Sequence, residues 1–357
     1  MKAKWLAATI FASTGIAYGQ SSVTLYGIVD NGVEYYNNSS TKGSFVGMPT
    51  LTGEVPSRWG LRGAEDLGSG YKAFFVLESG FALSNGTLGY GGRLFGRQAN
   101  VGLSTPLGSV TVGRQMNMSM YALFDADVIG PSVHSMASFD TYLPNARSDN
   151  AVGYLGTFGG FKLGATYSFG RDAAGPVGPS ATNCPGQVPG NILACRQYTM
   201  LAAYTGPQFG AAASYDVMRG GNGATAPLSS PGATDTHVIV DGYVNFGSGK
   251  VGMGWVRRNT SAGSHAQSDL FFLGGNYFFT PAFSADTQVV RYILRSHSDS
   301  TLMVGRLNYL LSKQTTLYTS VGYVINSEFG SAPVAAGGTV ATGKNQFGVM
   351  LGVQHKF

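Results

Sequence analysis

Residues 345–357 alternate between apolar side chains and small or polar ones. Phe347, Val349 and Leu351 fall on one face of an extended chain, whereas Met350 and Gln354 fall on the other. A period of two is the pattern of a β-strand, and an apolar face opposite a polar one is typical of a strand between lipid and water. We therefore predict that this segment is a membrane-facing strand.

The first strong alternation in the chain shows which face meets water. Val23, Leu25 and Val29 lie on one face of a predicted strand, while Asp30 and Glu34 lie on the other. Because carboxylates are expensive to bury in hydrocarbon, the acidic face must point to an aqueous interior. The apolar face is then the lipid-facing wall.

Apolar runs of strand length recur along the whole chain after the first 20 residues, about sixteen in all, and no shift in composition marks a second domain. They cover residues 23–36, 58–65, 71–81, 93–103, 109–116, 151–157, 161–169, 196–205, 210–217, 236–246, 250–259, 268–278, 284–293, 300–311, 316–326 and 345–357.

Short turns and long loops alternate between these runs. Turn formers occupy residues 66–70, 105–108, 158–160, 206–208, 247–249, 280–282 and 312–315, whereas longer Gly/Ser/Pro-rich connections include residues 37–57, 117–149, 170–195, 218–235 and 327–344. Outer-membrane barrels place short turns on the periplasmic side and long loops outside. The sequence therefore predicts an all-β fold: a transmembrane antiparallel β-barrel of sixteen strands.

The first 19 residues predict export. Lys2 and Lys4 precede an apolar stretch, and residues 17–19 form a small-x-small cleavage site, as in a signal peptide. We expect cleavage there, leaving residues 20–357 as a single transmembrane barrel domain. Its 21 basic and 18 acidic residues give a net charge of +3, which is too weak a bias to indicate a nucleic-acid partner. No later run reaches the roughly 18 apolar residues of a membrane helix.

Composition supports a membrane location. Charged residues make up 11% of the chain, against about 25% in soluble domains. Aromatic residues at 12% suit the interfacial girdles of a barrel, and glycine is abundant at 53 residues. On composition alone, a secreted Gly-rich β-sandwich is the alternative.

Two arginines are candidates for the lining of the channel. Arg58 and Arg62 share one face of their strand, while Trp59 and Leu61 share the other, so we expect both cations to enter the lumen. Fixed guanidinium groups in a narrow pore lower the barrier for anions and raise it for cations. In the structural alternative, the two arginines pair with wall carboxylates and hold the barrel shape.

Other chemistry is sparse in this sequence. Cys184 and Cys195 are the whole complement of cysteines and predict a disulfide within an external loop of an exported protein. The histidines lack the spacing of metal ligands, and we expect no metal and no cofactor. We also expect no enzymatic activity, because the nearest approach to a hydrolase motif is His134 with Asp140.

Several segments together resemble the general diffusion porins of Gram-negative bacteria, in the betaproteobacterial branch. These segments are residues 22–30, 57–68, 77–81, 92–99 and 112–115, together with the terminal Phe357. The resemblance implies an outer-membrane homotrimer of sixteen-stranded barrels, with the third external loop folded into each pore. It also implies contact with outer-membrane lipid and lipopolysaccharide, and a C-terminal Phe357 that is read by the barrel-assembly machinery.

The resemblance also implies a pore constriction. The connection 117–149 fits the inward loop by position and length, although it lacks the sequence motif that is common in this loop of the family. The matching basic positions at the wall are Arg58, Arg97 and Arg147, and Glu78 resembles the acidic residue near them. Arg62 on the wall and Asp125 and Asp127 on the loop complete the candidate constriction. We expect passive passage of ions and small hydrophilic solutes, with a mild anion preference. The alternatives are a substrate-specific channel and a loop-mediated adhesin or receptor on the same barrel.

Overall fold

The computed structural model describes residues 22–40, 43–172 and 181–357. The predicted signal peptide, residues 1–19, lies outside the described residues. Within the described part of the chain, no helix has the length or apolar character needed to cross a bilayer. The structure is built almost entirely from antiparallel strands.

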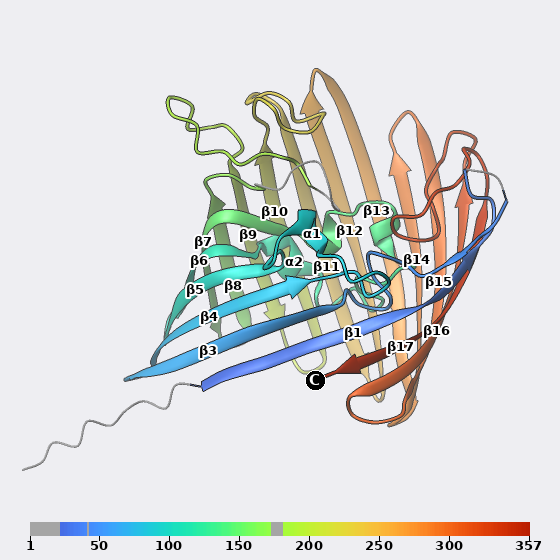
Figure 1. Ribbon diagram of the computed structural model, residues 1–357, viewed down its shortest axis with the longest axis horizontal. Coiled ribbons are helices and arrows are strands. Elements are labelled where there is room, and N and C mark those ends of the chain that lie inside the picture. The colour runs from blue at the N-terminus through green and yellow to red at the C-terminus, as the bar shows by residue number, and fades with distance from the viewer. Residues whose placement is uncertain (1–21, 41–42, 173–180) are drawn as a thin grey trace, which may run out of the picture.

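The described strands form one sheet that closes on itself (Figure 1). β2 (Phe45–Gly47) is a short addition to β1, and the other sixteen described strands make the ring, because β1 pairs with both β3 and β17. Those sixteen are β1 (Ser22–Tyr36), β3 (Arg58–Gly68), β4 (Tyr71–Gly80), β5 (Gln98–Thr105), β6 (Gly108–Met116), β7 (Arg147–Phe158), β8 (Phe161–Ser168), β9 (Gln197–Thr205), β10 (Phe209–Arg219), β11 (Thr234–Phe246), β12 (Gly249–Ala262), β13 (Ser264–Thr280), β14 (Phe283–Leu294), β15 (Ser298–Leu310), β16 (Thr315–Asn326) and β17 (Gln346–Lys356). The predicted sixteen-stranded barrel is confirmed.

The two ends of the barrel sequence meet at the seam. The backbone N–H of Gly27 donates to the carbonyl of Phe357 at 3.0 Å, and the N–H of Phe357 donates back to Gly27 at 3.1 Å. A Cβ at Gly27 would lie 2.3 Å from the Phe357 ring, so glycine makes room for the terminal aromatic residue. The last residue therefore takes part in closing the cylinder.

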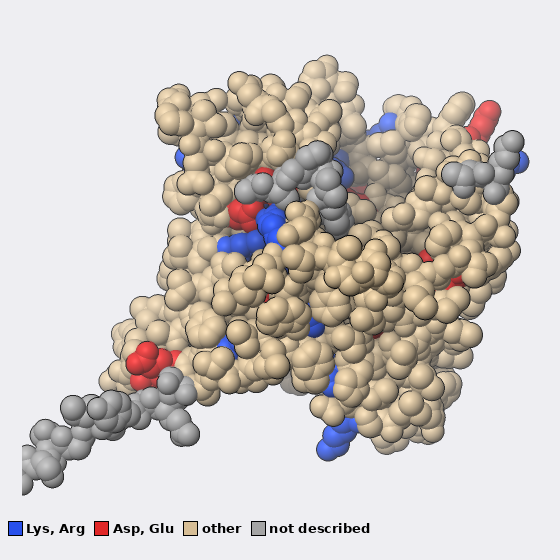
Figure 2. Space-filling model, viewed as in Figure 1, with Lys and Arg blue, Asp and Glu red and all other residues tan. Residues whose placement is uncertain are grey.

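The predicted alternation between faces is observed. On β17, Leu351 is 66% exposed on the outer wall, whereas Met350 is fully buried inside. Asp30 and Glu34 of β1 point inward and are both 2% exposed. Figure 2 shows that most of the outer surface in view carries no charge, as expected for a wall that meets hydrocarbon.

The connections follow the predicted asymmetry with two exceptions. β12 and β13 run on until Ala262 pairs with Ser264, and Gly263 makes the turn at φ 71°. β14 and β15 likewise reach Leu294 paired with Ser298. The strands predicted at residues 250–259, 268–278 and 284–293 were therefore too short. The prediction ended each strand where polar residues begin, but polar residues beyond the lipid can also continue a strand.

The strand predicted at residues 93–103 begins later, at Gln98. Tyr90 and Gly91 adopt left-handed backbone conformations, with φ of 54° and 76°, in the short α1 (Gly89–Gly92). The chain turns there and residues 93–97 form part of a connection. Arg97 consequently lies immediately before the first residue of β5, and its backbone N–H donates to the carbonyl of Glu78 at 3.1 Å.

Residues 117–146, which we call the inward loop, fill part of the barrel interior. They contain α2 (Met118–Leu123), η1 (Met136–Ser138) and η2 (Leu143–Asn145). In Figure 1 α2 lies within the outline of the barrel. The buried apolar residues of the inward loop pack against inward-facing apolar residues of the wall, among them Leu201, Ile239, Val256, Leu270 and Leu302. The inner face of these strands carries these apolar residues where it meets the loop and not water.

Cys184 and Cys195 form the predicted disulfide in the connection between β8 and β9. The N–H of Cys195 donates to the carbonyl of Gly220 at 2.9 Å, in the connection between β10 and β11. A Cβ at Gly221 would lie 2.5 Å from the Cys195 sulfur. The disulfide therefore packs directly against the neighbouring external loop.

Candidate functional site

Three predicted arginines converge inside the barrel around one carboxylate and one aromatic ring. We call Arg58, Arg97 and Arg147, with Glu78 and Tyr90, the arginine cluster. Arg97 Nε donates to Glu78 Oε1 at 2.7 Å, and Arg58 Nε lies 3.9 Å from Glu78 Oε2. Strands β3, β4 and β7 thus bring together residues that are far apart in the sequence.

Tyr90 is the centre of this cluster. Its hydroxyl accepts a hydrogen bond from Arg97 Nη1 at 2.7 Å, and the guanidinium carbons of Arg97 and Arg147 lie 5.7 and 5.3 Å from its ring centroid. Cations over an aromatic face are attracted by the ring quadrupole. A Cβ at Gly80 or Gly96 would lie 2.5 Å from Tyr90 atoms, so both glycines are needed for its close packing.

The charge around Tyr90 changes its acidity. Burial acts to raise the pKa of the Tyr90 hydroxyl, but the positive charges of Arg97 and Arg147 outweigh burial. The net shift of this pKa is downward from its ordinary value. The same positive potential also favours a passing anion.

Arg147 is the most deeply buried member of the cluster, at 1% exposure. Its Nε donates to the carbonyl of Arg97 at 3.0 Å. Its two Nη atoms make no hydrogen bond to any described residue. Because an uncompensated buried charge is costly, these donors are suited to water or an anion at the edge of the cluster.

A second group of charges lies next to the cluster and was not found from the sequence. Arg93 Nη1 and Nη2 donate to Asp149 at 2.9 Å and to Asp172 at 2.5 Å. Arg114 also binds Asp149. The family-like segments 92–99 and 112–115 contain both arginines, so the signal was present. Tyr90 was missed from the sequence as well.

Arg62 lies on the inner face of β3, closer to the short-turn end than Arg58. Its guanidinium carbon is 5.2 Å from the ring centroid of Tyr26, and the Tyr26 hydroxyl donates to Glu78 Oε2 at 3.0 Å. Its side chain is exposed in the lumen. Two cations, Arg62 and Arg58, therefore face the lumen at successive levels of β3, with Arg62 closer to the short turns.

Asp125 and Asp127 of the inward loop are placed elsewhere. Asp127 accepts a hydrogen bond from Gln288 of β14 at 2.8 Å, and burial raises the pKa of its carboxyl. The carbonyl of Asp125 accepts a hydrogen bond from Lys250 of β12 at 3.1 Å. Both acids therefore belong to the wall opposite the arginine cluster.

Polar contacts at several points hold the inward loop to the barrel wall. Asp216 of β10 is fully buried and accepts hydrogen bonds from Gln197, Ser119 and Tyr142. These partners come from β9, α2 and the far end of the loop. The network therefore binds the first and the last part of the inward loop to the adjacent strands β9 and β10.

Histidines anchor the middle of the inward loop. His134 Nδ1 lies 2.9 Å from Ser320 Oγ of β16, and its Nε2 lies 3.3 Å from Glu34 Oε1 of β1. His237 Nε2 lies 3.0 Å from Asp140 Oδ2. His134 and Asp140 are thus each engaged with the wall and not with one another.

Asp140 also receives a charge-assisted contact from Arg258 Nη1 at 3.2 Å. Burial opposes ionisation, but Arg258 and His237 together hold the pKa of Asp140 well below its usual range. Among the described residues, no group of three or more potential ligands is arranged for a metal ion.

Known proteins resemble this chain along its length. A sequence model described as Gram-negative porin matches residues 6–328. Outer membrane porin protein 32 of Delftia acidovorans is 30% identical over 381 aligned residues, covering 100% of both chains. An outer membrane porin of Bordetella pertussis is 35% identical over 243 aligned residues, which cover 62% of this chain and 61% of the relative.

Solved structures give the same picture. The anion-selective porin from Comamonas acidovorans aligns with a TM-score of 0.75 at 25% identity, covering 95% of this chain and 100% of that one. OmpT of Vibrio cholerae aligns with a TM-score of 0.65 at 17% identity, covering 94% and 98%. The likeness to OmpT concerns the fold alone.

Proposed function

This chain belongs to the Gram-negative porin family and is an outer membrane porin, and from the arginine cluster we propose that its channel passes small hydrophilic solutes with a preference for anions. The observation that carries the proposal is the excess of positive charge at the cluster. The guanidinium groups of Arg97 and Arg58 lie against one carboxylate, Glu78, and that of Arg147 lies over the Tyr90 ring beside them.

The selectivity follows from electrostatics at a narrow opening. An ion that enters loses part of its hydration, and fixed positive charge compensates that loss for an anion but not for a cation. Arginine keeps its charge across the physiological pH range. The protein resembles an anion-selective porin in structure, which supports the same preference here.

Reversal potentials across a planar bilayer test the proposal. With protein refolded in detergent and a KCl gradient across the membrane, we expect a potential of the sign given by chloride carrying most of the current. A potential of the opposite sign would contradict the anion preference. Insertion without any current would contradict channel function itself.

We also propose that the protein assembles as a homotrimer, which the barrel-assembly machinery inserts after reading the C-terminal Phe357. A trimer form is known for the structurally similar OmpT of Vibrio cholerae. The hydrogen bonds between Phe357 and Gly27 support a role for this terminus in completing the ring. Phe357→Ala should lower the yield of folded trimer in membranes, measured by electrophoresis without heating, while Lys356→Ala should not.

The external rim offers a site for lipopolysaccharide. Asp269 shares the outer face of β13 with the exposed residues Phe271 and Leu273. It accepts hydrogen bonds from Arg257 Nε at 2.8 Å and Arg295 Nη2 at 2.8 Å. These outward cations lie beyond the apolar band, at the level where phosphorylated lipid headgroups would meet them.

Double replacement Arg257→Ala with Arg295→Ala tests this rim contact. We expect less phosphate from lipopolysaccharide to copurify with the double variant than with the native protein. Lys313→Ala, at a short turn on the opposite side, serves as the charge-matched control. Equal lipid in all three proteins would contradict the proposed contact.

A further inference from the structure

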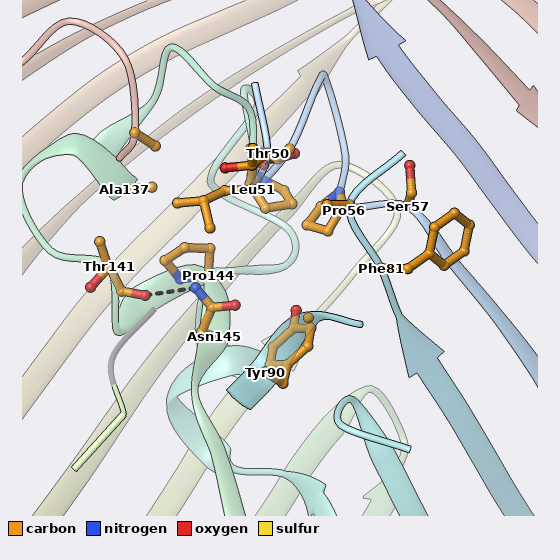
Figure 3. Close-up of a pocket in the computed structure, with 15 residues that line it drawn as sticks. Thr50, Leu51, Pro56, Ser57, Phe81, Tyr90, Ala137, Thr141, Pro144 and Asn145 are labelled. Carbon is orange, nitrogen blue, oxygen red and sulfur yellow. Dashed lines mark hydrogen bonds between the residues drawn. The ribbon is translucent and has the colours of Figure 1, made fainter. Parts of the chain in front are cut away.

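An apolar pocket lies directly beside the arginine cluster, where four connections of the barrel meet. Its lining is mainly apolar, and part of it is open to solvent. The side chains labelled in Figure 3 come from three of these connections and surround a common space. The main apolar surfaces come from Leu51, Pro56, Phe81, Tyr90, Pro131 and Pro144.

The polar groups in the pocket wall are already bonded to the protein. Thr52 Oγ1 donates to the carbonyl of Pro131 at 2.9 Å, and Ser57 Oγ donates to the carbonyl of Asp30 at 2.9 Å. Asn145 Nδ2 donates to the carbonyl of Thr141 at 2.8 Å, the contact drawn as a dashed line in Figure 3. The pocket therefore offers a guest mainly apolar contact.

One side of the pocket is electropositive. Tyr90 forms part of the lining, and its ring and hydroxyl bind the guanidinium groups of Arg97 and Arg147. Arg58 approaches from the other direction, since its Nη1 donates to the carbonyl of Pro56 at 3.1 Å. The apolar lining is thus joined to the arginine cluster through Tyr90 and Pro56.

We propose that this pocket binds small amphipathic anions, with aromatic monocarboxylates as the preferred class, and so gives the channel a substrate preference. The inference rests on the proposed anion-conducting function and refines it. The carboxylate would lie toward the arginine cluster, and the ring would pack against Leu51, Pro56 and Pro144.

The pairing of the two surfaces defines the class. Chloride or acetate can use the positive charge but has little apolar surface to bury. A neutral aromatic molecule can bury its surface but leaves the guanidinium donors unchanged. A molecule with both features gains from both, and an aromatic cation would be repelled.

Three probes in a planar bilayer test the pocket in the native trimer. Benzoate carries both features, acetate carries charge alone, and benzyl alcohol carries the ring alone. We expect benzoate to reduce chloride conductance at concentrations about tenfold below those of acetate, corresponding to the burial of part of one ring. Benzyl alcohol should leave chloride conductance unaltered over the same range.

Variants then assign the effect to the pocket. Leu51→Ser removes apolar contact and should bring the effect of benzoate closer to that of acetate within the same variant. Leu107→Ser, in a distant short turn where the leucine is 72% exposed, is the matched control. Thr50→Asp places a carboxylate on the exposed rim of the pocket and should weaken the block of chloride conductance by benzoate. Thr50→Asn, whose side chain is isosteric with aspartate but uncharged, should not weaken this block.

Each result is decisive for one of the two claims. Equal effects of benzoate and acetate in a channel that still prefers chloride over potassium would overturn the pocket and leave the proposed function intact. Blockade by benzyl alcohol, or benzoate blockade unaltered in both Leu51→Ser and Thr50→Asp, would also overturn it. Cation preference would overturn the proposed function first.

Discussion

The two inner walls of this barrel are built from different chemistry. On β3, β4 and β7 several inward side chains are charged, and they include Arg58, Glu78 and Arg147. On β11 to β16 many inward side chains are apolar, and Ile239, Val290 and Leu302 are fully buried beneath the inward loop. In the proposed function, the first wall meets the passing solute, while the second holds the inward loop in place.

The difference shows why the loop can stay in place inside an aqueous channel. Its buried apolar residues gain the same burial energy as a soluble core, because the barrel wall supplies an apolar partner for them. Charged side chains also occur on this wall, where several of them, such as Arg258 and Arg306, form ion pairs, whereas the arginine cluster lies on the opposite wall. Removing either chemistry should therefore damage a different property of the channel.

The largest effect is expected where the loop approaches the wall most closely. A Cβ at Gly252 of β12 would lie 2.0 Å from the carbonyl oxygen of Ala126. Gly252→Val should push the inward loop away from β12, at an overpacking cost of about 1–3 kcal/mol. We expect a higher single-channel conductance and weaker ion selectivity.

Gly305→Val is the control for that change. A Cβ at Gly305 of β15 meets no atom within 4 Å, so valine there should leave conductance at the native level. Native conductance in Gly252→Val would contradict the tight docking of the loop.

The next effect concerns the charged wall. Arg58→Ala should shift selectivity toward cations, because a unit charge about 8 Å from a passing ion contributes on the order of 1–2 kcal/mol before salt screening. Arg58→Lys keeps the charge and should retain most of the anion preference. Reversal potentials at low and high salt measure both, and identical values for Arg58→Ala and the native protein would make Arg58 purely structural.

A smaller effect should come from pH. The pKa of Tyr90 is lowered by Arg97 and Arg147, so its hydroxyl should ionise below the ordinary value of about 10. The resulting negative charge would neutralise part of the cluster, and anion preference should fall as pH rises from 7 toward 10. Tyr90→Phe should remove this dependence, and a native-like pH profile in that variant would assign the titration to another group.

The smallest effect on the pore is expected from the external disulfide. Cys184→Ala with Cys195→Ala releases a loop of 11 residues' separation, and the constraint is worth about 3 kcal/mol in the chain-entropy account. Conductance and selectivity should stay native, because both cysteines lie in an external connection. Proteolysis of the loop should become faster, and an altered reversal potential would show that this loop reaches the ion path.

The sequence predicted the barrel because lipid acts on every strand separately. Each wall strand must satisfy its backbone hydrogen bonds within the sheet and present apolar residues to the lipid. The alternation of apolar and polar residues is therefore visible in the sequence of individual strands, as in β1 and β17. The cysteine pair and the inward direction of Arg58 and Arg62 were predicted on the same local grounds. The strand boundary near Arg97 was wrong because Tyr90 and Gly91 turn the chain for reasons of tertiary contact.

The sequence by itself determined a closed cylinder with a charged inner face, since period and composition are properties of neighbouring residues. Tertiary structure alone decided that Tyr90 lies between two guanidinium groups, that Arg93 and Arg114 share Asp149, and that the loop acids lie on the far wall. These contacts join residues tens of positions apart. Their geometry depends on how the inward loop packs against the barrel, which no local pattern records.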